Sequence, residues 1–171
     1  MPNLTVLDRL ATDPLVVAQD GLATVHQLMD LGCASSVVAE RCRPAGPWRR
    51  VLPRVVHLRT DAPTPHQRLR AALLYAGPGA LLTGEAALAL HGVEAAPPLA
   101  DLPKVDVLVA RPVHPRSYGY VRIHRTHQRL TRVPVRDLAC VPVPRAVRDA
   151  IPYLNDEAAM TALLAEVGQS V

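Results

Sequence analysis

The sequence predicts an α+β protein with two parts, and three observations indicate this class. The chain has 171 residues, of which 49% are hydrophobic and 20% charged, a composition typical of globular proteins with enough chain for a core. Residues 1–60 combine short helical patterns with one small hairpin, whereas residues 64–171 mix helical and strand patterns. A turn-rich segment at 61–65 separates them. We therefore expect two domains with these bounds.

The first helices of the chain are expected to support the segment that follows them. Leu4 and the apolar positions Val6, Leu7 and Leu10 predict a first helix. A proline directly after an aspartate, as at Pro14, is typical of the start of another helix. We expect no chemistry from this region.

Two short helices joined by a glycine turn come next. Thr24 is placed to cap the first helix, because its side-chain oxygen can accept from an otherwise unpaired backbone N–H. Gly32 can end that helix in the left-handed conformation. Ser35 is placed to cap the second helix, which ends with Arg41 and Arg43 before prolines and a glycine stop it.

A small basic hairpin then closes this part of the chain. Two β-prone runs, Trp48–Leu52 and Val55–Leu58, flank a tip at Pro53-Arg54. Trp48 is expected to pack the hairpin onto the helices, and stacking on a base is the alternative. Helix, turn, helix and hairpin in this order predict a winged helix-turn-helix, whose second helix enters the major groove of DNA.

Charge supports a polyanionic partner for this segment. Six arginines and no acidic residue lie between Arg41 and Arg59, and a guanidinium group binds phosphate through two parallel hydrogen bonds. The alternative is a small helical domain with a solvated charged face. The candidate DNA-binding residues are Thr24, Ser35, Ser36, Glu40, Arg41, Arg43, Arg49, Arg50 and Arg54.

The second part is expected to hold a short antiparallel sheet between helices. Pro65 begins a helix that stops at Gly77, and Thr83 starts a helix rich in small residues. Alternation predicts strands at 104–110 and 120–125, with a third short strand within 133–140. Helices are predicted from Pro142 and again after residue 155. One face of such a sheet would be solvated.

The stretch 111–136 is the second basic region, and its role is left open. It holds seven arginines in 26 residues. It could extend a DNA footprint, bind RNA, dock an acidic partner, or be a solvated sheet face. The candidate residues for this nucleic-acid or partner surface are Arg111, Arg116, Arg122, Arg125, Arg129 and Arg132.

The chain resembles a known family through a series of short motifs. The N-terminal motifs are Gly21-Leu22-Ala23-Thr24, Gln27-Leu28, Gly32, Trp48-Arg49-Arg50-Val51 and the hairpin end at Val55–Leu58; later ones are Gln67-Arg68, Leu82–Ala87, His91-Gly92, Val105–Val109, Val121–Arg125 and Pro142–Ala150. They resemble the winged helix and following α/β region of AbiEi-type antitoxins. They also resemble the N-terminal region of actinobacterial proteins with a C-terminal Vsr-like endonuclease domain. The family often has glycine where this chain has Arg54.

The resemblance implies a DNA-binding transcriptional regulator. Such antitoxins repress their own operon and counter a nucleotidyltransferase-like toxin through a C-terminal domain. More sequence follows in the resembled proteins, so we expect a short family member or a shortened form of a longer protein. One alternative is a protein-interaction module whose winged-helix scaffold and basic sheet dock an acidic partner. Another is a recognition fragment left from a nuclease fusion.

Several other function classes are not expected. The carboxylate pairs, Asp156-Glu157 and Asp101/Asp106, lack the acid-plus-lysine pattern of a nuclease core, so we expect no enzyme. Three cysteines without C-x-x-C spacing predict buried thiols and no metal or cofactor. With no apolar run near about 20 residues and no signal-peptide pattern, we expect a cytoplasmic protein without a membrane partner. The operator and the oligomeric state stay open.

Overall fold

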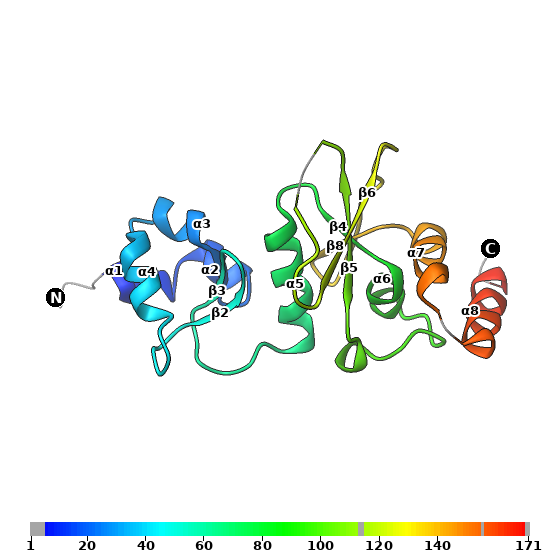
Figure 1. Cartoon of the computed structure of the whole chain (residues 1–171), viewed down its shortest axis with the longest axis horizontal. Coiled ribbons are helices and arrows are strands. Elements are labelled where there is room, and N and C mark those ends of the chain that lie inside the picture. Colours follow the sequence, from blue (N-terminus) through cyan, green and yellow to red (C-terminus); the bar gives the residue numbers. More distant parts are fainter. Residues whose placement is uncertain (1–5, 113–114, 155, 170–171) are drawn as a thin grey trace. The chain divides into compact units, whose positions relative to one another are not determined.

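The protein is an α+β chain of two compact units, each with its own small sheet (Figure 1). The computed structural model describes residues 6–112, 115–154 and 156–169, so Leu4 lies outside the described residues. The first unit is Met1–Tyr75 and the second is Ala76–Val171. The division falls near the end of helix α5 (Pro65–Ala76), whereas we expected a boundary at 61–64.

Side chains of helix α5 bind the backbone and the carboxylate of Asp20 in the first unit. Gln67 Nε2 donates to the carbonyl oxygen of Asp20 at 2.8 Å, and Arg70 Nε donates to the Asp20 carboxylate, also at 2.8 Å. Arg70 is buried, which makes this ion pair harder for solvent to screen than a surface pair.

Four short helices and a three-stranded sheet precede α5 in the first unit. Its elements are α1 (Val6–Leu10), α2 (Pro14–Ala18), β1 (Leu22–Thr24), α3 (Val25–Asp30), α4 (Ser35–Arg41), β2 (Arg49–Leu52) and β3 (Val55–His57). Strand β3 is central and antiparallel to both neighbours. Arg50 lies opposite Val56, and an irregularity between Arg50 and Leu52 shifts the register of the β2–β3 hairpin.

One apolar cluster joins the helices to this sheet. It contains Leu10, Val16, Leu28, Val38, Trp48 and Val56, all buried. Trp48 is 9% exposed and lies in this cluster between α4 and the hairpin, which confirms the expected packing role. Because each large apolar side chain contributes about 1.5–3 kcal/mol when fully buried, this cluster stabilises the packing of the helices on the sheet.

Helix α3 begins as the sequence predicts, and helix α4 does not. Thr24 Oγ1 accepts from Gln27 N at 3.1 Å, while Gln27 Oε1 accepts from Thr24 N at 2.8 Å, which completes a capping box. The prediction that Ser35 caps α4 was wrong. Ser35 is the first helical residue, and Ala34 occupies the cap position without a side-chain hydrogen bond.

The second unit contains a five-stranded sheet with helices packed against it. Its elements after α5 are β4 (Leu81–Thr83), α6 (Gly84–His91), η1 (Leu99–Asp101), β5 (Val105–Ala110), β6 (Val121–Thr126), β7 (Val133–Val135), β8 (Leu138–Cys140), α7 (Val143–Ala150), η2 (Ile151–Tyr153) and α8 (Glu157–Gln169). The strand order is β6-β5-β4-β8-β7. Helices α6 and α7 pack on each other; α6 also contacts β4 and β5, and α7 contacts β4 and α8.

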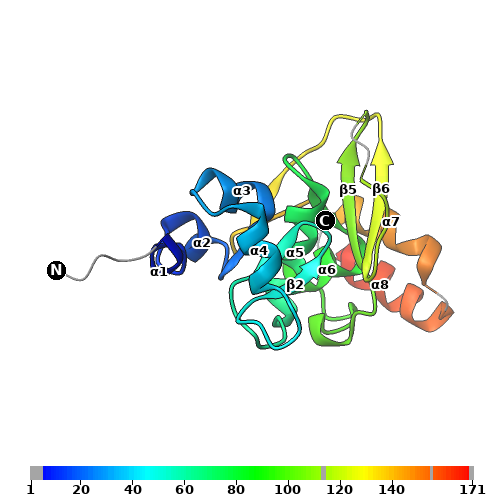
Figure 2. The same ribbon diagram turned by 60° about the vertical axis from the view of Figure 1, so that its left-hand side comes forward.

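The prediction of an antiparallel sheet in this unit was wrong, because the sheet is mixed. Strands β5 and β6 lie side by side with both arrows pointing the same way (Figure 2), and β4 is parallel to β8. The parallel register runs from Val105 opposite Val121 to Ala110 opposite Thr126. The predicted third strand is a hairpin, β7–β8, whose turn residues Arg136 and Asp137 both have positive φ.

Across the described ranges, no helix combines the length and the apolar character needed to cross a membrane.

Candidate nucleic-acid interface

Helix α4 presents a polar face to solvent. Ser35, Ser36 and Glu40 are exposed, whereas Val38 is buried in the apolar cluster. Arg41 is half-buried at the end of the helix. Glu40 and Arg43 form an exposed ion pair at 2.8 Å, which contributes little to stability but reduces the net charge of this end of α4.

The hairpin carries arginine at its tip in an unusual backbone conformation. Arg54 has φ of +64°, in the left-handed region that glycine adopts most easily. Its carbonyl oxygen accepts from Val25 N at 2.9 Å, which ties the tip to the start of α3. The strain of a side chain in this region is on the order of 1 kcal/mol. The fold therefore holds an exposed arginine at a position whose backbone conformation favours glycine.

The side chains of Arg49 and Arg50 lie on opposite faces of strand β2, because successive side chains on a strand alternate. Arg49 pairs across the sheet with His57, and Arg50 pairs with Val56 of the apolar cluster. Burial raises the pKa of the Cys42 thiol, and the charge of Arg50 offsets part of that rise. Arg50 thus lies on the α4 side of the hairpin, and Arg49 on the other side.

Four arginines of this segment have no carboxylate partner within the described part of the chain. They are Arg41, Arg49, Arg50 and Arg54. By contrast, Arg43 pairs with Glu40, and Arg59 Nε pairs with Asp61 Oδ1 at 3.0 Å. Thr24 is half-buried and its hydroxyl is occupied by the capping box, so its side chain serves α3.

The six candidate arginines of the stretch 111–136 do not share one environment. Arg111, Arg125, Arg129 and Arg132 are exposed, as is Arg116 in the loop before β6. The guanidinium of Arg125 donates to the carbonyl oxygen of Pro115. Arg122 instead turns inward to the carboxylate of Asp106 at 3.2 Å, with its guanidinium 3.8 Å from the centroid of the Tyr153 ring.

Sequence reasoning did not find the charged cluster around Asp106. This carboxylate is 4% exposed and accepts from Arg122 and from His124 Nε2, the latter at 2.6 Å. Burial raises the pKa of nearby Glu85, and the charge of Asp106 adds to that rise. The alternation of residues in the sequence indicated that Arg122 and His124 share one face of β6. It did not indicate that β5, which carries Asp106, is the neighbouring strand. Among the described residues, no three histidine, cysteine or acidic side chains are arranged to hold a metal ion.

Buried His57 is expected to make the stability of the first unit depend on pH. Its pKa is lowered, mainly by burial, while nearby Asp61 opposes the shift and Arg59 and Arg49 add to it. Below about pH 6.5 the unfolded chain therefore binds more protons than the folded chain does. The contribution of neutral, buried His57 to the free energy of unfolding is complete above that pH and is lost as pH falls toward the folded-state pKa. We expect a loss of up to about 1.4 kcal/mol at pH 5.5.

Urea unfolding followed by Trp48 fluorescence at pH 7.5 and 5.5 measures this effect. His57→Leu should remove the dependence, whereas His26→Gln, at an exposed position, should retain it. Equal pH dependence in both variants would contradict the assignment to His57.

No family model and no curated protein matches the chain. Exposed hydroxyl groups on α4 can donate to or accept from base edges, and unpaired guanidinium groups on the hairpin can donate to phosphate oxygens.

Proposed function

We propose that the first unit contains a winged helix-turn-helix that binds double-stranded DNA, as in the AbiEi-type antitoxins that the sequence resembles. The observation that carries this proposal is the set of four arginines without a carboxylate partner around α4 and the β2–β3 hairpin. Uncompensated charge on exposed guanidinium groups is the usual electrostatic feature of a phosphate-binding surface.

In this proposal α4 is the recognition helix. The N-terminal residues of such a helix contact base edges, and here these are Ser35 and Ser36, with Glu40 one turn later. The hairpin is the wing, and Arg50 and Arg54 contact phosphates beside the groove. Arg49 lies on the opposite face of β2. It adds to the positive electrostatic potential that attracts DNA and does not share the phosphate contacts of Arg50 and Arg54.

At the level of the whole chain, the function we propose is a DNA-binding regulator without enzymatic activity. By resemblance, it represses its own operon and neutralises a nucleotidyltransferase-like toxin. The alternative is a protein-interaction module, favoured by the exposed arginines 111, 129 and 132, which have no carboxylate partner among the described residues. That surface would dock an acidic protein.

Binding of the purified chain to its own upstream DNA and to an unrelated duplex, over a salt series, tests the proposal. We expect preference for the upstream DNA and an affinity that falls linearly in a log–log plot against salt. Equal, weak binding to both duplexes that vanishes near physiological salt would contradict it and favour the acidic protein partner.

Arg54→Gly separates the charge of the wing tip from its fold. Glycine relieves the positive φ, so we expect unfolding free energy to stay the same or rise by about 0.5 kcal/mol. If Arg54 contacts one phosphate, the salt slope should decrease in magnitude by about 0.9. Arg59→Gln is the matched control, because the ion pair with Asp61 already neutralises that arginine. An unchanged slope in Arg54→Gly would remove the tip from the interface.

A further inference from the structure

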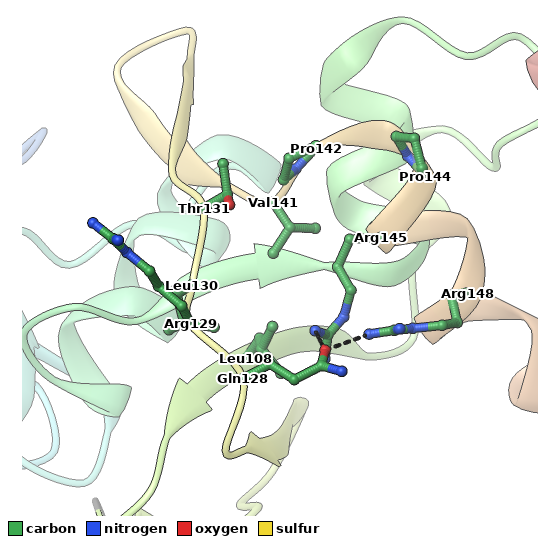
Figure 3. A pocket seen from close by; sticks show the side chains of 10 residues that line it. All are labelled: Leu108, Gln128, Arg129, Leu130, Thr131, Val141, Pro142, Pro144, Arg145 and Arg148. Atoms are coloured by element: carbon green, nitrogen blue, oxygen red, sulfur yellow. Dashed lines mark hydrogen bonds between the residues drawn. The ribbon is translucent and has the colours of Figure 1, made fainter. Parts of the chain in front are cut away.

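A cavity of about 300 Å³ lies in the second unit between the loop 128–131 and the start of α7 (Figure 3). Leu108 of β5 and Val141 form apolar walls, and Arg145 and Arg148 reach in from α7. This volume is at the lower end of the range for small-ligand pockets, about 300–1,000 Å³. Nothing in the proposed DNA contacts uses this cavity.

Two guanidinium groups converge on one neutral oxygen at the edge of the cavity. Arg145 Nη1 and Arg148 Nη2 each donate to Gln128 Oε1, both at 3.2 Å (Figure 3). Two cationic donors on a single atom are the arrangement that binds an oxyanion, and their hydrogen bonds to an anion are shorter and stronger than those to an amide. The Gln128 amide oxygen therefore occupies the position of an anionic ligand atom.

The charges around this position leave one positive charge in excess. Asp149 accepts from Arg145 Nε at 2.8 and 2.9 Å and lies 3.9 Å from Arg148 Nε. The Thr83 hydroxyl donates to Asp149 at 2.7 Å and fixes this carboxylate. Arg129 lines the cavity but its guanidinium points away from it (Figure 3). One surplus charge fits a singly charged carboxylate better than a doubly charged phosphate.

The remaining walls are aliphatic. They come from Leu108, Leu130, Val141, Pro142 and Pro144, with Thr131 as the one hydroxyl-bearing residue, and the described lining contains no aromatic ring. Bases are usually held by stacking on aromatic side chains, which makes a nucleotide a poor fit. A ligand with a hydrocarbon body and one terminal carboxylate matches both the walls and the converging guanidinium groups.

We propose that this cavity binds a carboxylate carried on an aliphatic body, which displaces Gln128 Oε1 from between Arg145 and Arg148. Two sources share this chemistry: a free short-chain carboxylic acid, and a glutamate side chain flanked by aliphatic residues in a peptide. The proposal does not depend on DNA binding by the first unit.

Titration of the full chain with hexanoate, followed by calorimetry and by backbone amide NMR shifts, tests the proposal. We expect hexanoate to shift the amides of 128–131 and 145–148, and the uncharged analogue hexanamide to bind at least about tenfold more weakly. A capped peptide Leu-Leu-Glu-Leu-Leu distinguishes the sources: tighter binding than hexanoate assigns the pocket to a partner protein, and weaker binding assigns it to a free acid.

Three variants make the test specific. Arg148→Gln should weaken hexanoate binding at least about tenfold. Arg59→Gln has the same change in net charge and should stay within about twofold, because Arg59 pairs with Asp61 and does not line the cavity. Gln128→Ala should strengthen binding, since the competing oxygen is gone. Equal affinity for hexanamide, tighter binding of inorganic phosphate, equal effects of the two arginine variants, or no binding at all would overturn the proposal.

Discussion

Replacing Asp106 with asparagine is expected to destabilise the second unit by about 3 kcal/mol. The carboxylate is 4% exposed and accepts from Arg122 at 3.2 Å and His124 at 2.6 Å. Removing its charge leaves the Arg122 guanidinium, whose side chain is only 29% exposed, without its hydrogen-bonded carboxylate. Breaking a buried ion pair on one side is costly because the remaining charge stays desolvated.

The surrounding structure gives the variant little room to adjust. An added Cβ at Gly84 would lie 3.2 Å from the Asp106 side chain, so the backbone of α6 already closes on this carboxylate. Tyr153 stacks on Arg122 and places its ring edge-on to His124, with centroids 5.6 Å apart. We expect these contacts to keep Arg122 and His124 near residue 106 after the carboxylate is neutralised.

The single tryptophan supplies an internal control for this measurement. Trp48 lies in the first unit, so its fluorescence follows that unit, whereas far-UV circular dichroism follows both. In Asp106→Asn we expect the dichroism transition in urea to move to lower concentration and the fluorescence transition to move much less. Asp101→Asn, at an exposed position, should change neither by more than about 0.5 kcal/mol. Equal shifts of both transitions in Asp106→Asn would contradict a local role.

The sequence predicts the first unit well where the signals are local. The Thr24 cap, the stop at Gly32 and the Pro53-Arg54 tip each depend on residues a few positions apart, and the structure contains all three. The start of α4 is the exception. A serine ahead of a helical pattern is an equally good cap or first-turn residue, and the conformation of Ala34 decides between them.

Strand pairing in the second unit could not be predicted from alternation. A period of two indicates which residues share a face, but it is the same for parallel and antiparallel neighbours. The direction of β6 depends on how the chain connects β5 to β6. This direction decides which residue of β5 lies opposite Arg122. One arginine proposed for an exposed basic surface therefore lies against Asp106, which is opposite it in the register.

Trp48→Ala is expected to cost about 3–5 kcal/mol in the first unit, because truncation of a buried tryptophan leaves a cavity. Trp48 lies in the same apolar cluster as Val38 of α4 and Val56 of β3, and its backbone N–H donates to the Arg41 carbonyl at 3.1 Å. The same residue thus connects the proposed recognition helix to the proposed wing. We expect DNA affinity to fall together with stability.

Urea unfolding by far-UV circular dichroism and DNA binding at a fixed salt concentration separate packing from base stacking. Trp48→Phe keeps an aromatic ring in the core and should retain most of the stability and binding. If Trp48→Ala unfolds at the wild-type urea concentration yet loses DNA binding, the ring contacts a base and the packing explanation fails. If stability and binding are lost together and Trp48→Phe restores both, Trp48 acts by fixing the wing to α4, and the arginines of the hairpin depend on it for their position.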